Sequence, residues 1–155
     1  MKVREFCSRT VAVIGPDATL REAALLMRDA HVGALVVTER KAGVTRPVGV
    51  ITDRDIVVAV VAVPGARPEG IRVRDVMSPH LLLAREDDGL AEIVKAMREG
   101  GVRRLPVAAA DGSLFGIVTL DDVLRVLGGE LGNLALALSR GREQEAGTRR
   151  RLDPP

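Results

Sequence analysis

The sequence predicts an α/β fold made of two β-α-β-β-α repeats that pack around a pseudo-twofold axis. Three observations lead to this prediction. A Gly-x-x-Thr-x-x-Asp string occurs twice, at residues 49–55 and 116–122. Many residues ahead of the first string recur unchanged 70 positions later, and each copy carries one amphipathic helical pattern. Because a repeat of about sixty residues is marginal alone, the two are expected to pack as one module.

Each repeat is expected to open with a short strand, at Val11–Ile14 in the first and at Leu81–Ala84 in the second. A helix should follow each strand. Apolar residues stand at positions i, i+3, i+4 and i+7 counted from Leu20, and again counted from Leu90, which is typical of a helix with one buried face.

The beginnings of these two helices also carry capping signals. Thr19 and Glu22 have capping-box spacing in the first repeat, and Asp88 and Glu92 stand near the corresponding places in the second. We therefore expect both helices to begin at these residues.

A β-hairpin is predicted after each helix. Its arms are Ala34–Thr38 and Val48–Ile51 in the first repeat, and Arg104–Ala108 and Leu114–Val118 in the second, with a glycine-bearing loop between the arms. The first loop is three residues longer than the second, and a loop is the place where such a difference is easily accommodated.

A second helix should close each repeat. Ile56–Val63 is rich in β-branched residues, which favour strands, but its counterpart at residues 121–127 has a more helical composition, so we predict helices for both. After Gly128-Gly129, a further helix is expected over Glu130–Ala146, with the last residues disordered. The predicted organisation is repeat 1 at 1–64, a linker at 65–72, repeat 2 at 73–130 and a helical or disordered Arg-rich tail at 131–155.

Charge and composition restrict the function. Residues 1–138 contain 18 basic and 18 acidic side chains, whereas residues 139–155 contain five Arg and three acids. A broad basic face for nucleic acid is therefore not expected on the repeats. Cys7 is the only cysteine, and neither a secretion signal nor a membrane-spanning segment is evident, so we expect a cytoplasmic protein. Twenty Arg against three Lys indicates a high-GC bacterial coding background.

The Thr-x-x-Asp spacing has two interpretations. At a strand-to-helix junction, Thr followed by an acid three residues later resembles a capping box, which would be the simpler explanation for a single copy. The same geometry also suits a nucleotide. Helix amides and the Thr hydroxyl can donate to phosphate, and Asp can accept from two ribose hydroxyls.

The two repeats resemble a tandem pair of CBS domains, the modules named after cystathionine β-synthase, over roughly residues 3–130. The resemblance rests on the duplicated string, on Val102–Val107 and on the Asp75–Pro79 lead-in to repeat 2. His31–Leu35 and Thr52–Val57 are also similar to stand-alone actinobacterial CBS pairs of the hypoxic-response type.

The resemblance implies a regulatory, non-catalytic Bateman module that binds an adenosyl effector, namely AMP, ATP, NAD or S-adenosylmethionine, in clefts between the repeats. It implies no obligatory cofactor and no metal. Thr52 and Asp55 would hold phosphate and ribose in one cleft, and Thr119 and Asp122 would do so in the other.

The two clefts are not expected to be equivalent. The resemblance assigns Arg103 and Arg104 to the Asp55 cleft as phosphate contacts, whereas the aligned residues of repeat 1 are the uncharged Gly33 and Ala34. Arginines would disfavour cationic S-adenosylmethionine there. The Asp55 cleft is therefore the stronger candidate for a phosphorylated ligand.

The expected partners are an adenine nucleotide, a second copy in a homodimer and an unknown effector protein, with no membrane and no nucleic acid. The alternative function is a ligand-independent dimeric interaction scaffold whose Arg-rich tail contacts an acidic partner or nucleic acid. Catalysis is not expected. The paired carboxylates on each helix diverge, and neither a zinc-ligand cluster nor a Gly-x-Ser-x-Gly string is present.

Overall fold

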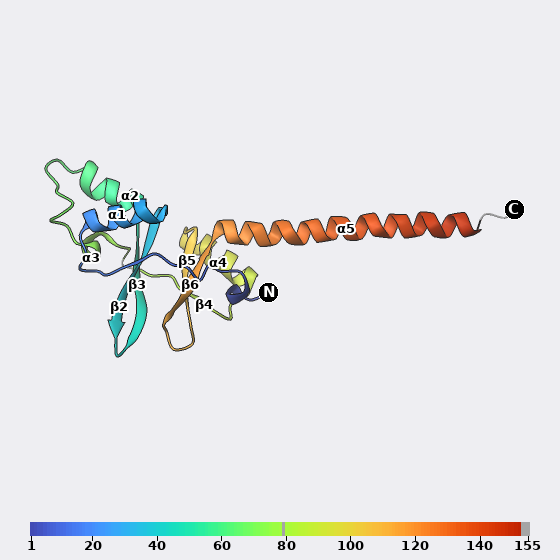
Figure 1. Ribbon diagram of the computed structural model, residues 1–155, viewed down its shortest axis with the longest axis horizontal. Helices are drawn as coiled ribbons and strands as arrows, with labels where there is room; N and C mark the ends of the chain where they lie inside the picture. The colour runs from blue at the N-terminus through green and yellow to red at the C-terminus, as the bar shows by residue number, and fades with distance from the viewer. Residues whose placement is uncertain (79, 153–155) are drawn as a thin grey trace. The chain divides into compact units, whose positions relative to one another are not determined.

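The computed structural model describes residues 1–78 and 80–152, with side chains described as far as residue 145. The chain divides into two units, Met1–Leu120 and Asp121–Pro155. Its elements, most of them labelled in Figure 1, are η1 (Val3–Glu5), β1 (Val13–Ile14), α1 (Leu20–Ala30), β2 (Ala34–Lys41), β3 (Val44–Thr52), α2 (Asp53–Ile56), η2 (Val57–Val61), α3 (Val73–Val76), β4 (Ala84–Arg85), α4 (Leu90–Gly100), β5 (Arg104–Ala108), β6 (Leu114–Thr119) and α5 (Leu120–Leu152).

Two three-stranded sheets, in the orders β1-β2-β3 and β4-β5-β6, form the N-terminal unit. In each sheet the first strand is parallel to the second, and the second is antiparallel to the third. Both hairpins also carry a register shift at matching places, Val37/Thr38 and Val107/Ala108. The predicted α/β class with two equivalent repeats is therefore confirmed.

The strand lengths differ from the predicted ones. The opening strands keep only two residues each, β1 and β4, instead of four. The first hairpin is longer than predicted, because β2 and β3 stay paired as far as Lys41 and Val44. The residues between them, Ala42 and Gly43, have φ of 51° and 80°, and two positive φ values at a two-residue turn match the twist of a hairpin.

The capping prediction is confirmed for α1 and wrong in part for α4. Thr19 and Glu22 form a reciprocal capping box at α1. At α4 the N-cap is Gly89, whose N–H donates to Glu92 at 2.6 Å. Asp88 instead accepts from the N–H of Arg85 at 2.7 Å, so its side chain stabilises the preceding turn and not the helix.

The helix predicted over Ile56–Val63 is present as two contiguous pieces. The α2 helix ends at Ile56, and η2 continues it as a π-helix that ends at Val61. Ala59 and Val60 of this segment pack against the first core, whereas Val61 is 78% exposed. The wider π turn coincides with a run of β-branched side chains, which crowd a regular α-helix.

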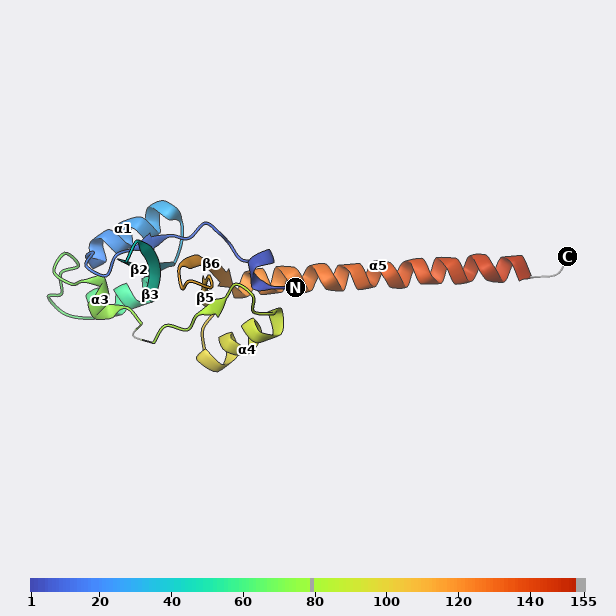
Figure 2. The ribbon, with the colours of Figure 1, turned by 90° about the horizontal axis from the view of Figure 1, so that it is seen from below.

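The C-terminal unit is one helix, and the predicted break at Gly128-Gly129 is wrong. The α5 helix runs without interruption from Leu120 to Leu152, as Figure 2 also shows. The separate helix predicted over Glu130–Ala146 is thus the middle of a longer one. The disorder predicted for the last residues is not found up to Leu152, and residues 153–155 lie outside the described part of the chain.

The segments that lead into the two repeats, residues 3–8 and 73–78, are called the lead-ins. They cross over, so that each packs on the other repeat. The N–H of Val3 donates to Asp88 O, and 70 residues later the N–H of Val73 donates to Ala18 O, both at 2.8 Å. Val3 and Val73 are both fully buried, and Val73 belongs to the core of the first repeat. The lead-ins therefore tie the two repeats into one unit.

The crossing explains the glycine of the repeated string. Ser8 exchanges two backbone hydrogen bonds with Ile117, and the N–H of Ser78 donates to Val50 O. These contacts bring each lead-in against the glycine of the other repeat. A Cβ on Gly116 would lie 2.5 Å from Ser8 O, and a Cβ on Gly49 would lie 2.6 Å from the Met77 sulfur. The crossing segment thus excludes a Cβ at Gly116 through its backbone and crowds one at Gly49 through the Met77 side chain.

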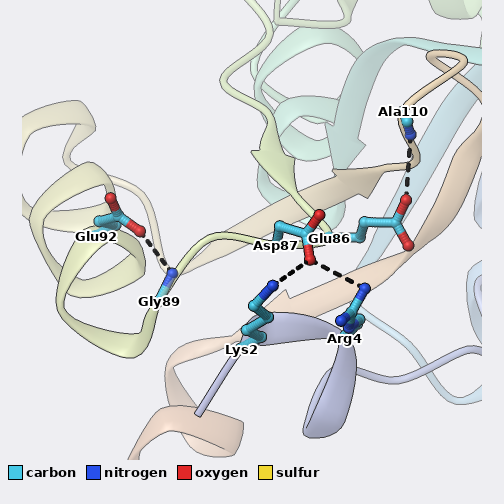
Figure 3. A network of polar contacts seen from close by, with 7 residues as sticks. All are labelled: Lys2, Arg4, Glu86, Asp87, Gly89, Glu92 and Ala110. Carbon is cyan, nitrogen blue, oxygen red and sulfur yellow. Dashed lines mark hydrogen bonds and ion pairs between the residues drawn. The ribbon is translucent and has the colours of Figure 1, made fainter.

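A polar cluster fastens the first lead-in to repeat 2 (Figure 3). Asp87 accepts from Lys2 Nζ at 2.8 Å and pairs with Arg4 Nη1 at 3.0 Å. In the same loop, Glu86 accepts from the N–H of Ala110. The pKa of Asp87 lies below its ordinary value, chiefly because of the Lys2 hydrogen bond and then because of the Arg4 charge.

We predict that Gly116→Ala destabilises the protein more than Gly49→Ala does. The new methyl group at Gly116 meets a backbone oxygen that cannot move alone, so we expect a loss of about 1–3 kcal/mol in the free energy of unfolding. The Met77 side chain can rotate away from Gly49. Urea denaturation of both variants checks the order, and equal losses would contradict the role given to Ser8.

The residues that end α1 and α4 make a matched pair. His31 and Gly101 occupy the same left-handed position, with φ of 52° and 62°. A non-glycine residue costs roughly 1 kcal/mol there. We predict that His31→Gly raises the melting temperature and that Gly101→Ala lowers it, as measured by thermal denaturation. A lower melting temperature for His31→Gly would show that its imidazole makes a stabilising contact.

The Asp87 cluster should make stability depend on pH. A carboxyl with a lowered pKa contributes stability above its ordinary pKa, and loses it as the pH falls through the lowered value. Asp87→Asn should therefore lower the denaturation midpoint at pH 7 and flatten its dependence between about pH 5 and 2. In a Lys2→Ala/Arg4→Ala background, Asp87→Asn should have no such effect, and an unchanged effect would argue against these ion pairs.

Candidate functional site

A cleft of about 300 Å³ lies within the N-terminal unit and collects residues from three separate parts of the sequence. The end of β3 and the beginning of α2 form one side. The turn before β5 forms another, and the second lead-in supplies the third. The lining residues are Val50, Thr52, Asp53, Arg54, Asp55, Ser78, Val102, Arg103 and Arg104. The structure thus brings together four residues selected from the sequence: Thr52, Asp55, Arg103 and Arg104.

Thr52 and Asp55 form a capping box at the beginning of α2. The Thr52 N–H and hydroxyl both donate to Asp55 Oδ2, at 2.8 and 2.7 Å, and the Asp55 N–H donates to Thr52 Oγ1 at 3.3 Å. All three bonds leave Asp55 Oδ1 unused within the described residues. Capping and ligand binding are therefore compatible, because each can use a different carboxylate oxygen.

The three arginines around the cleft are available for an anion. Arg103 and Arg54 are exposed and Arg104 is half-buried. Among the residues that the structure describes, none of the three forms an ion pair. The Arg103 backbone is held in place, because its carbonyl accepts from the N–H of Leu120 at 2.9 Å. Three guanidinium groups beside two carboxylates favour a ligand that carries negative charge.

Sequence reasoning did not select three polar residues of this cleft. Arg54 was not selected, although it stands one residue from Asp55. Ser78 was not selected, because only the crossing of the lead-in brings it here. Asp53 was weighed only as part of a carboxylate pair, and the pair was not expected to act because adjacent side chains on a helix diverge. In the structure its Oδ1 accepts from the N–H of Arg54 at 2.8 Å, and its Oδ2 lies 3.0 Å from an ideal Cβ on Gly33.

The second pair of selected residues falls in two different units. Thr119 ends β6 in the N-terminal unit, whereas Asp122 stands in the first turn of α5 in the C-terminal unit. Asp122 Oδ1 accepts from Arg125 Nη1 at 2.9 Å. One of its oxygens is therefore already engaged by a cation, in contrast to Asp55, which has no cationic partner among the described residues.

The described residues contain no group of three or more His, Cys, Asp or Glu side chains that could hold a metal ion. None of the described helices is both long enough and apolar enough to cross a bilayer.

The CBS-domain family profile matches two segments of the chain, residues 3–62 and 73–129. An uncharacterised protein of Methanopyrus kandleri is 38% identical over 126 residues, which are 81% of this chain and 62% of that protein. The CBS domain-containing protein YhcV of Bacillus subtilis is 35% identical over 121 residues, which are 78% of this chain and 81% of that protein. The chain thus spans less than two thirds of the Methanopyrus relative.

Solved structures agree with the sequence relatives. The cytosolic domain of the Mg²⁺ channel MgtE in complex with ATP superposes with a TM-score of 0.68 at 28% identity, over 81% of this chain and 48% of that one. Hypoxic Response Protein I, solved with two coordinated zinc ions, gives a TM-score of 0.70 at 30% identity, over 81% of this chain and 98% of that one. The profile covers both repeats and the relatives span the same region, so the chain belongs to the CBS-domain family as a tandem pair.

Proposed function

We propose that this chain is a non-catalytic regulatory module that binds an adenine nucleotide in the Asp55 cleft and signals by a conformational shift. One observation carries the proposal. The cleft combines Asp55 Oδ1, a carboxylate oxygen without a partner among the described residues, with the three guanidinium groups of Arg54, Arg103 and Arg104. Its volume of about 300 Å³ stands at the lower end of the range for small-molecule sites.

The roles follow from the hydrogen bonds. A ribose hydroxyl can donate to Asp55 Oδ1 while the capping box stays intact. The Thr52 hydroxyl hydrogen is already given to Asp55 Oδ2, so Thr52 would orient the carboxylate and would give up that bond if it donated to a phosphate. Arg103 and Arg104 are therefore the main phosphate contacts in this proposal, with Arg54 as a third cation.

The choice of an adenine nucleotide is supported by the relatives. The MgtE cytosolic domain, 28% identical to this chain, was solved in complex with ATP. AMP, ATP and NAD all offer a ribose and at least one phosphate. S-adenosylmethionine carries a positive sulfonium group, which three arginines disfavour.

A ligand in this cleft would touch both repeats. Asp55 belongs to repeat 1, Arg103 and Arg104 belong to repeat 2, and Ser78 belongs to the segment that crosses between them. Occupancy would therefore favour one arrangement of the repeats over another, provided that the arrangements bind the ligand with different affinity.

The proposal also covers assembly and location. We propose that the protein self-associates and acts on a downstream effector protein. A solved relative, the CBS-CP12 protein from bloom-forming cyanobacteria, is hexameric and 27% identical to this chain. A cytoplasmic location is also proposed, because adenine nucleotides are abundant there and the MgtE relative is a cytosolic domain.

Isothermal titration with AMP, ATP, NAD, S-adenosylmethionine and adenosine tests the proposal. Asp55→Ala should weaken nucleotide binding by about tenfold or more, since a hydrogen bond to a charged group contributes roughly 1.5–3 kcal/mol. Glu22→Ala is the matched control. It removes the equivalent capping box of α1, formed with Thr19, and should cost stability without changing affinity.

Two further results separate the proposed contacts. Arg103→Ala/Arg104→Ala should weaken ATP binding and reduce its dependence on salt, while leaving adenosine binding unchanged. If Asp55→Ala binds as tightly as the unmodified protein, or if none of the five compounds produces heat or thermal stabilisation, the string acts only as a helix cap. The ligand-independent interaction scaffold then becomes the better explanation.

A further inference from the structure

The α5 helix carries a leucine seam, defined here as Leu124, Leu127, Leu131, Leu134 and Leu138. Successive members are three, four, three and four residues apart, which is the a and d spacing of a coiled coil. All five are exposed, from 41% at Leu127 to 68% at Leu138. Three of them lie beyond residue 129, where the CBS-domain match ends.

The sequence of α5 gives the helix little stability of its own while the leucine seam is exposed to water. Its middle contains Gly128, Gly129, Gly132 and Gly141, and at each of them an added Cβ would meet no atom within 4 Å. Glycine is a poor helix former, and helices in water depend mainly on packing of an apolar face. A glycine-rich helix with an exposed leucine row is therefore stabilised best by a partner that covers the row.

The charges along α5 indicate which partner fits. Asp121 precedes the seam and Arg142 follows it. In the heptad that the leucines define, with Leu124, Leu131 and Leu138 at position a, Asp121 and Arg142 both stand at position e. A second α5 in the parallel orientation would place these like charges at the same level of the two helices. In the antiparallel orientation Asp121 of one helix lies beside Arg142 of the other, and the helix dipoles also oppose.

We propose that α5 pairs with the α5 helix of a second copy of this chain as an antiparallel two-stranded coiled coil. The leucine seam of one α5 packs against the identical seam of the other. The distribution of charge along the helix favours the antiparallel orientation. This interaction goes beyond nucleotide sensing, because it assigns a self-association surface to the segment that follows the repeats.

Light scattering coupled to size exclusion, on the full chain, tests the pairing. Leu131→Asp/Leu138→Asp should halve the molecular mass of the assembly. The matched control is Leu136→Asp, because Leu136 is 61% exposed but stands outside the seam, on the opposite side of the helix. The control should keep the mass of the unmodified protein. A monomeric unmodified protein, or a seam variant of unchanged mass, would overturn the proposal.

Two supporting measurements keep the result interpretable. The far-UV circular dichroism of the seam variant should show less helix, while thermal denaturation of its repeats remains cooperative. Nucleotide titration of the same variant should match the unmodified protein, because the Asp55 cleft lies within the N-terminal unit. Failure of the coiled coil and failure of nucleotide binding are thus distinguishable.

Disulfide trapping tests the orientation, in a Cys7→Ser background. Gly141 stands at the next d position of the seam, so Gly141→Cys would face its own copy in a parallel pair and would oxidise readily. In an antiparallel pair the two cysteines lie far apart. We expect no disulfide from Gly141→Cys, and efficient formation from Leu131→Cys/Leu134→Cys near the middle of the seam, because position a of one helix faces position d of the other in an antiparallel pair. A disulfide-linked Gly141→Cys dimer would overturn the antiparallel arrangement.

Discussion

The exchange of lead-in segments is the constraint on which the N-terminal unit depends. Val73 fills the core of the first repeat although it precedes the second, and Val3 is buried where its segment bonds to repeat 2. The same exchange fixes the glycine of each string, since Gly49 and Gly116 lie against the crossing segment. It also places Ser78 in the cleft, so the same crossing contributes residues to the core and to the candidate site.

The capping box at α2 shows how one motif can serve stability and binding together. Asp55 Oδ2 receives both hydrogen bonds from Thr52, which holds the carboxylate in one orientation. Oδ1 is then presented to the cleft without the entropy cost of ordering a free side chain. Thr19 and Glu22 build the same box at α1 but do not line this cleft, so the surroundings of a capping box decide whether it can also bind.

Local patterns in the sequence predicted local structure well. The apolar spacing of α1 and α4 and the duplicated string were enough for the repeat order, because helical periodicity and capping act over a few residues. Two local expectations nevertheless failed. Asp88 bonds to Arg85 and not to the helix that follows it, and Gly128-Gly129 does not interrupt α5, because glycine lowers helix propensity without forbidding the helix.

The candidate site could also be predicted only in part from the sequence. Thr52 and Asp55 were found from their spacing, and Arg103 with Arg104 from the resemblance to CBS domains. Ser78 could not be found in this way, because its presence in the cleft depends on which repeat the lead-in joins. A comparison of the two lead-ins would have selected Ser8 and Ser78 together, but without saying where either one lies.

The crossing of the lead-ins has a consequence for how such a fold could arise. The first repeat completes its core with Val73, which belongs to the segment ahead of the other repeat. An ancestor with one repeat would have had to exchange that segment with a second chain, as in a domain-swapped dimer. Gene duplication followed by fusion would then have joined two already interlocked subunits, leaving residues 62–72 as the connection between them.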